Sequence, residues 1–241
     1  MEANEFLEPF ERMLAELFPP ARVRAIEAGD PGTAEWAAVE QSGFLDALGS
    51  EDAGGAALAP GEVLPLFMAL GRHAAPLPVG ETMLARAGHR NALPLLRAAQ
   101  IAGAAERVLA MSVTYANERT QFGKPIGRQQ AVQQQLAVMA EDVVATRLAA
   151  QLAAGRGWPS PESIAAAKSV ASAAAARIAN TAHAVHGAIG ISAEYDLQLY
   201  TRRLHQWRLD HGAETLWNRR LGAAVLGRDA TALDWIRNEL F

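Results

Sequence analysis

The second half of the chain consists of long stretches in which apolar residues recur every three or four positions. The clearest stripe is Val132, Leu136, Met139 and Val143, a spacing that places all four side chains on one face of a helix. Glycine or proline separates these stretches, and Ser160 stands before one of them as a plausible N-cap. The pattern predicts five helices: one at about 95–118, one that carries this stripe and stops near Gly155, one that starts after Ser160-Pro161-Glu162, and two at about 195–209 and 214–226.

The first ninety residues show the same period in shorter runs that are divided by helix breakers. The first run ends at Pro19-Pro20, a later one is expected to stop at Gly71, and the proline-rich segment 75–78 is expected to be extended. Strand signals are few, because alternating runs of Val, Ile and Thr are missing. We therefore predict an all-α fold, with an N-terminal helical domain at 1–94 and a four-to-five-helix up-down bundle at 95–241.

The amino-acid composition excludes several kinds of chemistry for this chain. Half of the residues are apolar and a fifth are charged, which is typical of a soluble globular protein. The absence of cysteine excludes disulfides, thiol nucleophiles and thiolate metal ligands. No apolar stretch is long enough for a membrane span, and the acidic start does not resemble a signal peptide. The expected location is the cytoplasm.

The net charge of −4 is unevenly distributed, because residues 1–94 carry an acidic excess and residues 95–241 a basic one. The basic residues are almost all arginines, which suit bidentate phosphate binding and ion pairs alike. An anionic partner is therefore expected to dock on the second half. For Arg202-Arg203, Arg208 and Arg219-Arg220, solvated helix faces and ion pairs with the acidic first half are expected rather than contacts to phosphates. No basic stripe is interleaved with aromatic residues, so nucleic acid is not an expected partner.

Two segments of the second half have sequences that helix formation alone does not explain. One is NERTQFGKPIG at 117–127, followed by Gln129-Gln130, and the other is HGAIG at 186–190, followed by Glu194-Tyr195-Asp196-Leu197. Both segments, and the distance between them, resemble the signature motifs of the acyl-CoA dehydrogenase family. Shorter matches to that family's N-terminal helical domain occur in the family's order upstream, including Gly43-Phe44-Leu45, Leu70-Gly71-Arg72 and Glu81-Thr82.

The resemblance implies a flavoprotein whose bundle binds FAD across a subunit interface. The matching positions suit that role: a guanidinium can grip a pyrophosphate, amides can donate and accept, and glycine lets the backbone approach a cofactor. The alternative for the arginine is a helix-end residue bonding the last carbonyls, and for the glycines it is a plain turn between helices. The predicted cofactor-binding residues are Arg119, Gln121, Phe122, Gln130, Gly187 and Gly190.

One large part of the family pattern is missing. The family has a β-barrel domain between its N-terminal helices and its bundle, whereas residues 83–94 of this chain are too few to form one. That domain normally covers one face of the flavin and helps to hold the acyl-CoA. The expectation is a chain that works with a barrel-containing acyl-CoA dehydrogenase subunit in a hetero-oligomer.

The family's catalytic glutamate is also missing, since its usual position falls on His211-Gly212 and an alternative one near Leu93-Pro94. Three sources of a base remain open: a carboxylate of the partner, His211 oriented by Asp210 or Asp196, or Glu214 in a remodelled turn. The remaining possibility is that His211 is an ordinary polar turn residue.

Two functions are compatible with these features. The first is a subunit of a flavin-dependent acyl-CoA dehydrogenase that desaturates an acyl-CoA thioester, for which steroid side chains are one candidate class suggested by the resemblance. The second is a catalytically inactive helical scaffold or regulatory partner of a full-length dehydrogenase. A metal site is not expected, because His183 and His186 lie three residues apart without a third ligand nearby.

Overall fold

The structure, a computed structural model, describes residues 4–227 and 231–239, and in this part of the chain it is helical almost throughout. The strands in it are β1 (Thr120–Gln121) and β2 (Lys124–Pro125), which form one antiparallel pair. The prediction of an all-α fold is confirmed. Along the described residues, none of the helices combines the length and the hydropathy that crossing a bilayer requires.

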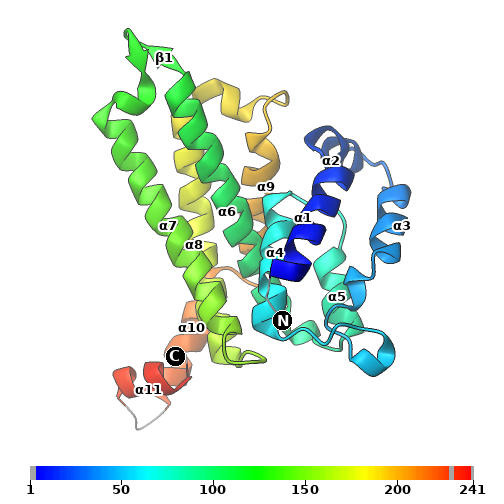
Figure 1. The fold of residues 1–241 in the computed structure, drawn as a ribbon. Helices are drawn as coiled ribbons and strands as arrows, with labels where there is room; N and C mark the ends of the chain where they lie inside the picture. The colour runs from blue at the N-terminus through cyan, green and yellow to red at the C-terminus, as the bar shows by residue number, and fades with distance from the viewer. Residues whose placement is uncertain (1–3, 228–230, 240–241) are drawn as a thin grey trace.

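Five helices form the bundle, and α6, α7 and α8 are its long members, standing side by side (Figure 1). Their bounds are α6 (Leu93–Glu118), α7 (Gln130–Ala154), α8 (Pro161–His186), α9 (Leu197–Leu209) and α10 (Glu214–Leu226). These bounds agree with the predicted helices to within about two residues. The start of α8 shows why: Ser160 Oγ accepts the N–H of Ser163 at 3.1 Å, and Pro161 fills the first helical position. A further short helix, α11 (Ala232–Glu239), follows.

The N-terminal helices cover the side of the bundle that α6 and α9 form (Figure 1). Their bounds are α1 (Asn4–Leu17), α2 (Pro20–Glu27), α3 (Thr33–Gln41), α4 (Pro60–Arg72) and α5 (Val79–Arg86). Short 3₁₀ turns lie between them at Phe44–Asp46 and Glu51–Ala53. The apolar core is continuous, because one cluster of buried side chains runs from Phe10 in α1 to Trp217 in α10. The division into two domains at 94/95 stays a prediction.

Two glycines bring α4 and α6 into backbone contact. A Cβ on Gly103 would lie 1.8 Å from the carbonyl oxygen of Met68, and one on Gly71 would lie 2.0 Å from that of Gln100. The helices can therefore cross this closely only because both positions lack a side chain. The predicted stop of α4 at Gly71 falls one residue before its end at Arg72, and the glycine also serves the packing of the two helices.

The connection from α5 to α6 is short. It consists of residues 87–92, which include a 3₁₀ turn at Arg90–Ala92. The chain therefore passes directly from the N-terminal helices into the bundle, and this completely described link holds no β-domain. The predicted absence of the middle domain is confirmed.

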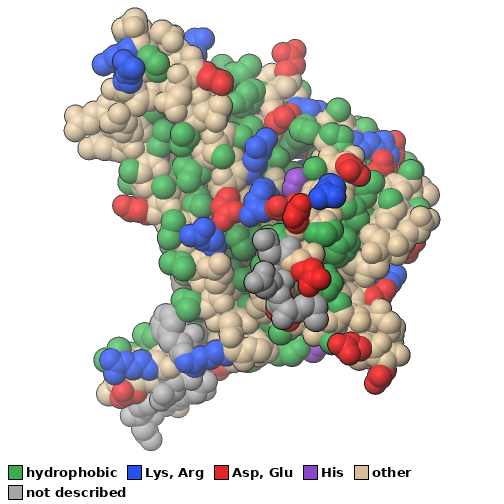
Figure 2. All heavy atoms as spheres, viewed as in Figure 1, with side chains coloured by type: hydrophobic (Ala, Val, Ile, Leu, Met, Phe, Trp, Pro, Cys, Tyr) green, Lys and Arg blue, Asp and Glu red, His purple; other side chains and the backbone are tan. Residues whose placement is uncertain are grey.

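Arginines of the bundle form ion pairs with acids of the N-terminal part. Arg202 and Arg203 both bind Glu27, and Arg97 Nη1 lies 2.7 Å from a carboxylate oxygen of Glu81. The prediction of ion pairs with the acidic first half is confirmed for Arg202 and Arg203, whereas Arg208 pairs with Glu214 of its own half. Figure 2 shows acidic and basic side chains mixed along this boundary over α6.

Candidate functional site

A small β-hairpin at the end of α6 carries the first motif, and it stands at one end of the bundle (Figure 1). Thr120 pairs with Pro125 and Gln121 with Lys124, so Phe122 and Gly123 form the turn. Both turn residues have positive φ, 52° and 77°, as a two-residue hairpin turn of the I′ type requires. The strand propensities of this stretch are weak, and the sequence pattern did not predict the hairpin.

The side chains predicted to bind the cofactor project from this hairpin and from the start of α7. We call Arg119, Gln121, Phe122 and Gln130 the signature patch; all four are exposed, and Phe122 is 93% exposed. Within the described chain, the side chains of Arg119, Gln121 and Gln130 make no hydrogen bond or ion pair. Figure 2 shows this end of the molecule standing clear of the rest, with basic side chains at its tip. The patch therefore offers polar groups and an aromatic ring that residues 4–227 and 231–239 leave uncovered.

The second motif lies at the same end of the bundle. Ala116 of α6, Ile126 after the hairpin and Val185 of α8 form a small apolar cluster of their own. Tyr115 stacks on His186 with ring centroids 4.5 Å apart, which joins the ends of α6 and α8 a second time. The structure thus brings together two segments that are about sixty residues apart in the sequence.

The two predicted glycines serve different purposes. Gly187 has a φ of 62° and is exposed, and no heavy atom lies within 4 Å of where its Cβ would be. Gly190 is buried, and a Cβ there would lie 2.9 Å from the Cβ of His186. Gly187 therefore leaves its backbone open to an approaching molecule, whereas Gly190 lets the turn Gly187–Ile191 pack on α8.

The two histidines near these glycines, His183 and His186, each make a hydrogen bond within the protein. His183 Nε2 lies 3.0 Å from Thr201 Oγ1, and His186 Nδ1 lies 2.8 Å from the carbonyl oxygen of Ala182. Burial lowers the pKa of both rings, so both are neutral near pH 7. The described ranges contain no group of three His, Asp or Glu side chains arranged to hold a metal ion.

The predicted catalytic turn lies between α9 and α10, toward the other end of the bundle. His211 stands there with a φ of 59°, and its side chain is exposed. Loss of hydration, aided by the nearby charge of Arg97, lowers the pKa of His211 below its usual value. The ring is therefore neutral near pH 7 and chemically able to accept a proton.

The acids considered as partners of His211 are held elsewhere. Asp210 accepts a hydrogen bond from Arg97 Nε at 3.0 Å. Asp196 pairs with Arg24 at 2.5 Å and sits at the opposite end of the 13-residue helix α9, roughly 20 Å away from His211 at 1.5 Å per residue. Within the described residues both carboxylates are bound by arginines and neither makes a hydrogen bond to His211, so the orientation of the imidazole by Asp210 or Asp196 stays a prediction.

Glu214 is not a free base either. Its carboxylate accepts from Arg208 Nε at 2.9 Å and also pairs with Nη2. These bonds lower the pKa of Glu214 to about 2, so the group binds no proton near neutral pH. The turn would have to break this pair before Glu214 could take part in proton transfer.

A buried lysine binds the turn that carries His211. Lys168 of α8 is fully buried, and its Nζ donates to Ser172 Oγ at 2.7 Å and to the carbonyl oxygens of Arg208 and Gly212 at 2.9 and 3.0 Å. Sequence reasoning missed this role, because a lysine within an alanine-rich helix is typical of a solvated face.

Arg97 links the two positions at which the family glutamate was sought. It lies one turn after Leu93-Pro94 on α6 and binds Asp210 beside His211, so both positions adjoin the same guanidinium. The carboxylates bound to Arg97 are Asp210 and Glu81. The signal for this group was present in the sequence as two polar residues, Arg97 and Gln100, in an otherwise apolar helical stretch.

Comparisons with known proteins agree with this architecture. The sequence model of the acyl-CoA dehydrogenase C-terminal domain matches residues 94–226, which is more than half of the chain. The chain therefore belongs to the acyl-CoA dehydrogenase family.

Particular relatives share either sequence or fold. Acyl-CoA dehydrogenase IpdE2 of Mycolicibacterium smegmatis is 38% identical over 118 residues, which make up 49% of this chain and 37% of that protein. The matched stretch thus spans little more than a third of the relative. A chain of the ChsE4-ChsE5 complex from Mycobacterium tuberculosis superposes with a TM-score of 0.84 over 95% of this chain and 99% of that one, at 20% identity. The Tcur3481-Tcur3483 steroid ACAD variant gives 0.81 over 93% and 99%, at 19% identity, so these two likenesses show the fold.

Proposed function

We infer that the chain is one subunit of a flavin-dependent acyl-CoA dehydrogenase and contributes part of an FAD site at a subunit interface. The observation that carries the proposal is the signature patch: a guanidinium, two amides and a 93% exposed aromatic ring without partners among the residues that the structure describes. Leaving a phenylalanine ring in water forgoes about 2 kcal/mol of burial energy, so the patch is best explained by an occupant. FAD would supply the hydride acceptor of the reaction.

The chemistry of the patch fits that cofactor. Arg119 offers a forked pair of donors for a pyrophosphate, Gln121 and Gln130 offer amide donors and acceptors, and Phe122 offers a flat apolar face. Gly187, at the same end of the bundle, leaves its backbone accessible to the adenosine part. A second polypeptide is needed to cover the exposed side of such a site, because the described link between α5 and α6 holds no β-domain to do so.

The partner in this proposal is a barrel-containing acyl-CoA dehydrogenase subunit, and the substrate is an acyl-CoA thioester, acted on in the cytoplasm. Support comes from the ChsE4-ChsE5 complex, in which a chain covered to 99% by this fold occurs together with another protein. The partner also supplies the catalytic carboxylate, since Asp210 and Glu214 are held by Arg97 and Arg208. His211 is the alternative base within this chain. The steroid named for the second structural relative is a candidate substrate class.

A scaffold without flavin is the second candidate function. The specific observation in its favour is that the carboxylates around the catalytic turn are committed to structural ion pairs. A scaffold, however, gives no reason for the exposed ring of Phe122 beside an unpaired guanidinium. The flavin-binding role therefore accounts for more of the structure.

Co-expression with a full-length acyl-CoA dehydrogenase separates the two functions. The purified complex should show flavin absorbance that is bleached by acyl-CoA, and Arg119→Ala should lower its flavin content at least tenfold. The matched control is Arg156→Ala, since Arg156 is also exposed but lies in the loop after α7, at the far end of the bundle. A colourless complex, or unchanged flavin content in Arg119→Ala, would contradict the proposal and favour the scaffold.

A further inference from the structure

The outer face of α7 is left uncovered by the rest of the described chain. Figure 1 shows α7 at the edge of the bundle, on the side away from α1, α2 and α3. The buried side chains of α7, among them Met139, Val143 and Ala150, pack toward the bundle, and the opposite side of the helix is exposed. This helix therefore presents a free face to its surroundings.

The free face of α7 has the spacing of a surface on which two helices pair. Six exposed residues follow one another at alternating steps of four and three, so they lie within roughly 80° of one another at 3.6 residues per turn. We call them the α7 seam: Gln134, Val138, Glu141, Ala145, Leu148 and Leu152. A repeat of this kind keeps a stripe in contact with a second helix along its length. The seam is roughly 27 Å long at 1.5 Å per residue, which is enough for a partner helix of several turns.

Most of the α7 seam is apolar. Val138 is 57% exposed, Leu148 is 47% exposed and Leu152 is 46% exposed, and the small side chain of Ala145 lies between them. A continuous row of exposed apolar side chains marks a contact with another molecule. The row is therefore best explained by an apolar helix face that covers it.

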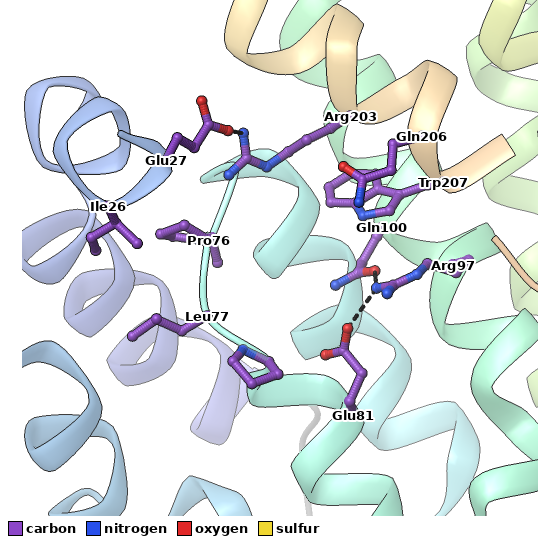
Figure 3. A pocket seen from close by; sticks show the side chains of 12 residues that line it. Ile26, Glu27, Pro76, Leu77, Glu81, Arg97, Gln100, Arg203, Gln206 and Trp207 are labelled. Carbon is purple, nitrogen blue, oxygen red and sulfur yellow. Dashed lines mark hydrogen bonds and ion pairs between the residues drawn. The ribbon is translucent and has the colours of Figure 1, made fainter. Parts of the chain in front are cut away.

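The other side of the bundle is different, because the chain covers it with its own N-terminal helices. Figure 3 shows this boundary from close by: Glu27 of α2 pairs with Arg203, and Glu81 of α5 pairs with Arg97 at 2.7 Å. The charges of these four side chains are thus neutralised within the chain.

Glu141 is the charged residue of the α7 seam, and its carboxylate has no partner among the residues that the structure describes. Two arginines in its neighbourhood are bound to other acids. Arg147 Nη1 lies 3.8 Å from Glu106 Oε1, and Arg177 Nη2 lies 2.5 Å from Asp142 Oδ1. A helix that covers the seam would bury the carboxylate of Glu141 and must therefore supply a cation for it.

A second copy of α7 does not supply that cation. In a two-fold antiparallel pair, the midpoint of the seam lies between Glu141 and Ala145, so each Glu141 would face Ala145 of the other copy. The two carboxylates would then be only about 6 Å apart along the helix axis. In a parallel pair they would face each other directly. Self-pairing would thus bury two like charges without a counterion, which is unfavourable.

We propose that the α7 seam binds an amphipathic helix of the barrel-containing subunit, with a lysine or arginine of that helix opposite Glu141. Glu141 then determines the choice of partner, because the carboxylate that attracts a basic helix also keeps two copies of this chain apart. The inference rests on the proposed function, which requires such a subunit at the signature patch. Gln130 of that patch precedes Gln134 by about one helical turn, so one partner can cover the patch and the seam together.

Sedimentation equilibrium of the isolated chain tests the role of Glu141 in preventing self-pairing. Glu141→Leu removes the charge and extends the apolar row, so it should tighten self-association at least tenfold relative to the wild type. Glu16→Leu is the matched control, because Glu16 is an exposed glutamate on α1, and this variant should sediment like the wild type. Equal self-association of the wild type and Glu141→Leu would overturn this role.

Co-purification with the co-expressed full-length acyl-CoA dehydrogenase tests the docking itself. Leu148→Asp and Val138→Asp place a further carboxylate in the seam, and each should lower the yield of complex at least tenfold. Glu141→Lys should do the same, because it repels a basic helix. Leu209→Asp is the control and should leave the yield unchanged, since Leu209 is 65% exposed at the end of α9. Circular dichroism of each variant shows that the chain is folded.

The docking site and the FAD site fail in different ways. A flavin-containing complex that forms equally well with Leu148→Asp and Val138→Asp would overturn the docking site and leave the FAD site intact. A colourless complex that both substitutions disrupt would overturn the FAD site and support the docking site. Absence of any complex with the wild type would overturn both.

Discussion

The buried ammonium of Lys168 lies 3.0 Å from the carbonyl oxygen of Gly212, so α8 directly holds the turn that carries His211. A second carbonyl of that turn region, from Arg208, binds the same ammonium at 2.9 Å. A charge is expensive to bury unless several acceptors surround it, and this one is surrounded by three oxygens. The geometry of the turn therefore depends on a side chain more than forty residues away in the sequence.

Lys168→Met should lower the free energy of unfolding by about 2 kcal/mol, because the carbonyls of Arg208 and Gly212 lose their donor while the aliphatic volume is kept. Urea denaturation measures the change. Lys124→Met is the control, since Lys124 is exposed on the hairpin and its replacement should change stability by less than about 0.5 kcal/mol. Equal effects of the two substitutions would show that the buried bonds contribute nothing.

The same lysine predicts a pH dependence of stability. Burial lowers the pKa of Lys168 from 10.5 to about 8, against the opposing charges of Asp210 and Glu214. Between these two pH values the unfolded chain binds a proton that the folded chain has released, so stability should rise with pH. Relative to Lys168→Met, the free energy of unfolding of the wild type should increase by no more than about 3 kcal/mol by the upper of these two pH values. If the stability of the wild type relative to Lys168→Met stayed constant or fell over this pH interval, the lowered pKa of Lys168 would be contradicted.

Gly103→Ala should destabilise the protein by about 3 kcal/mol or more, because the new Cβ would meet the carbonyl oxygen of Met68 and force α4 away from α6. Thermal unfolding followed by circular dichroism reports the loss. Gly222→Ala is a matched control in α10, where no atom lies within 4 Å of the added Cβ. That change should instead stabilise the protein by about 0.5 to 1 kcal/mol, as alanine does in a helix.

Phe122→Ala should leave the stability of the isolated chain within about 0.5 kcal/mol of the wild type, because the ring is 93% exposed. The same change should reduce flavin retention by the assembled complex, since the ring is proposed to cover the cofactor. Phe10→Ala provides the contrast: Phe10 is fully buried, so its removal should cost about 3 to 5 kcal/mol. If Phe122→Ala destabilised the isolated chain as much as Phe10→Ala does, the result would argue against a role of Phe122 in contact with another molecule.

The helices were predictable because their signals are local. The 3.6-residue period, the Ser160 cap and the proline after it act within one or two turns, so the sequence defines α6 to α10 closely. The packing role of Gly71 was not predictable because it depends on Gln100 of α6, a backbone that only the folded chain brings near. A glycine in a helical run is equally compatible with a stop and with a close crossing.

The contacts around the turn that carries His211 were less predictable for the same reason. Arg97 and Asp210 are 113 positions apart, and no local pattern links them. The commitment of Asp196 to Arg24 likewise depends on how α2 lies against the end of α9. The motif positions, by contrast, were found through their resemblance to a family, and their location at one end of the bundle follows from the contacts among Ala116, Ile126 and Val185.

The crossing of α4 on α6 also explains why the helical parts hold together across so short a link. Because Gly71 and Gly103 fix the two helices by direct backbone contact, residues 87–92 bear little of that task. A domain could therefore be inserted or removed at this link between α5 and α6 while the helices on either side keep their packing.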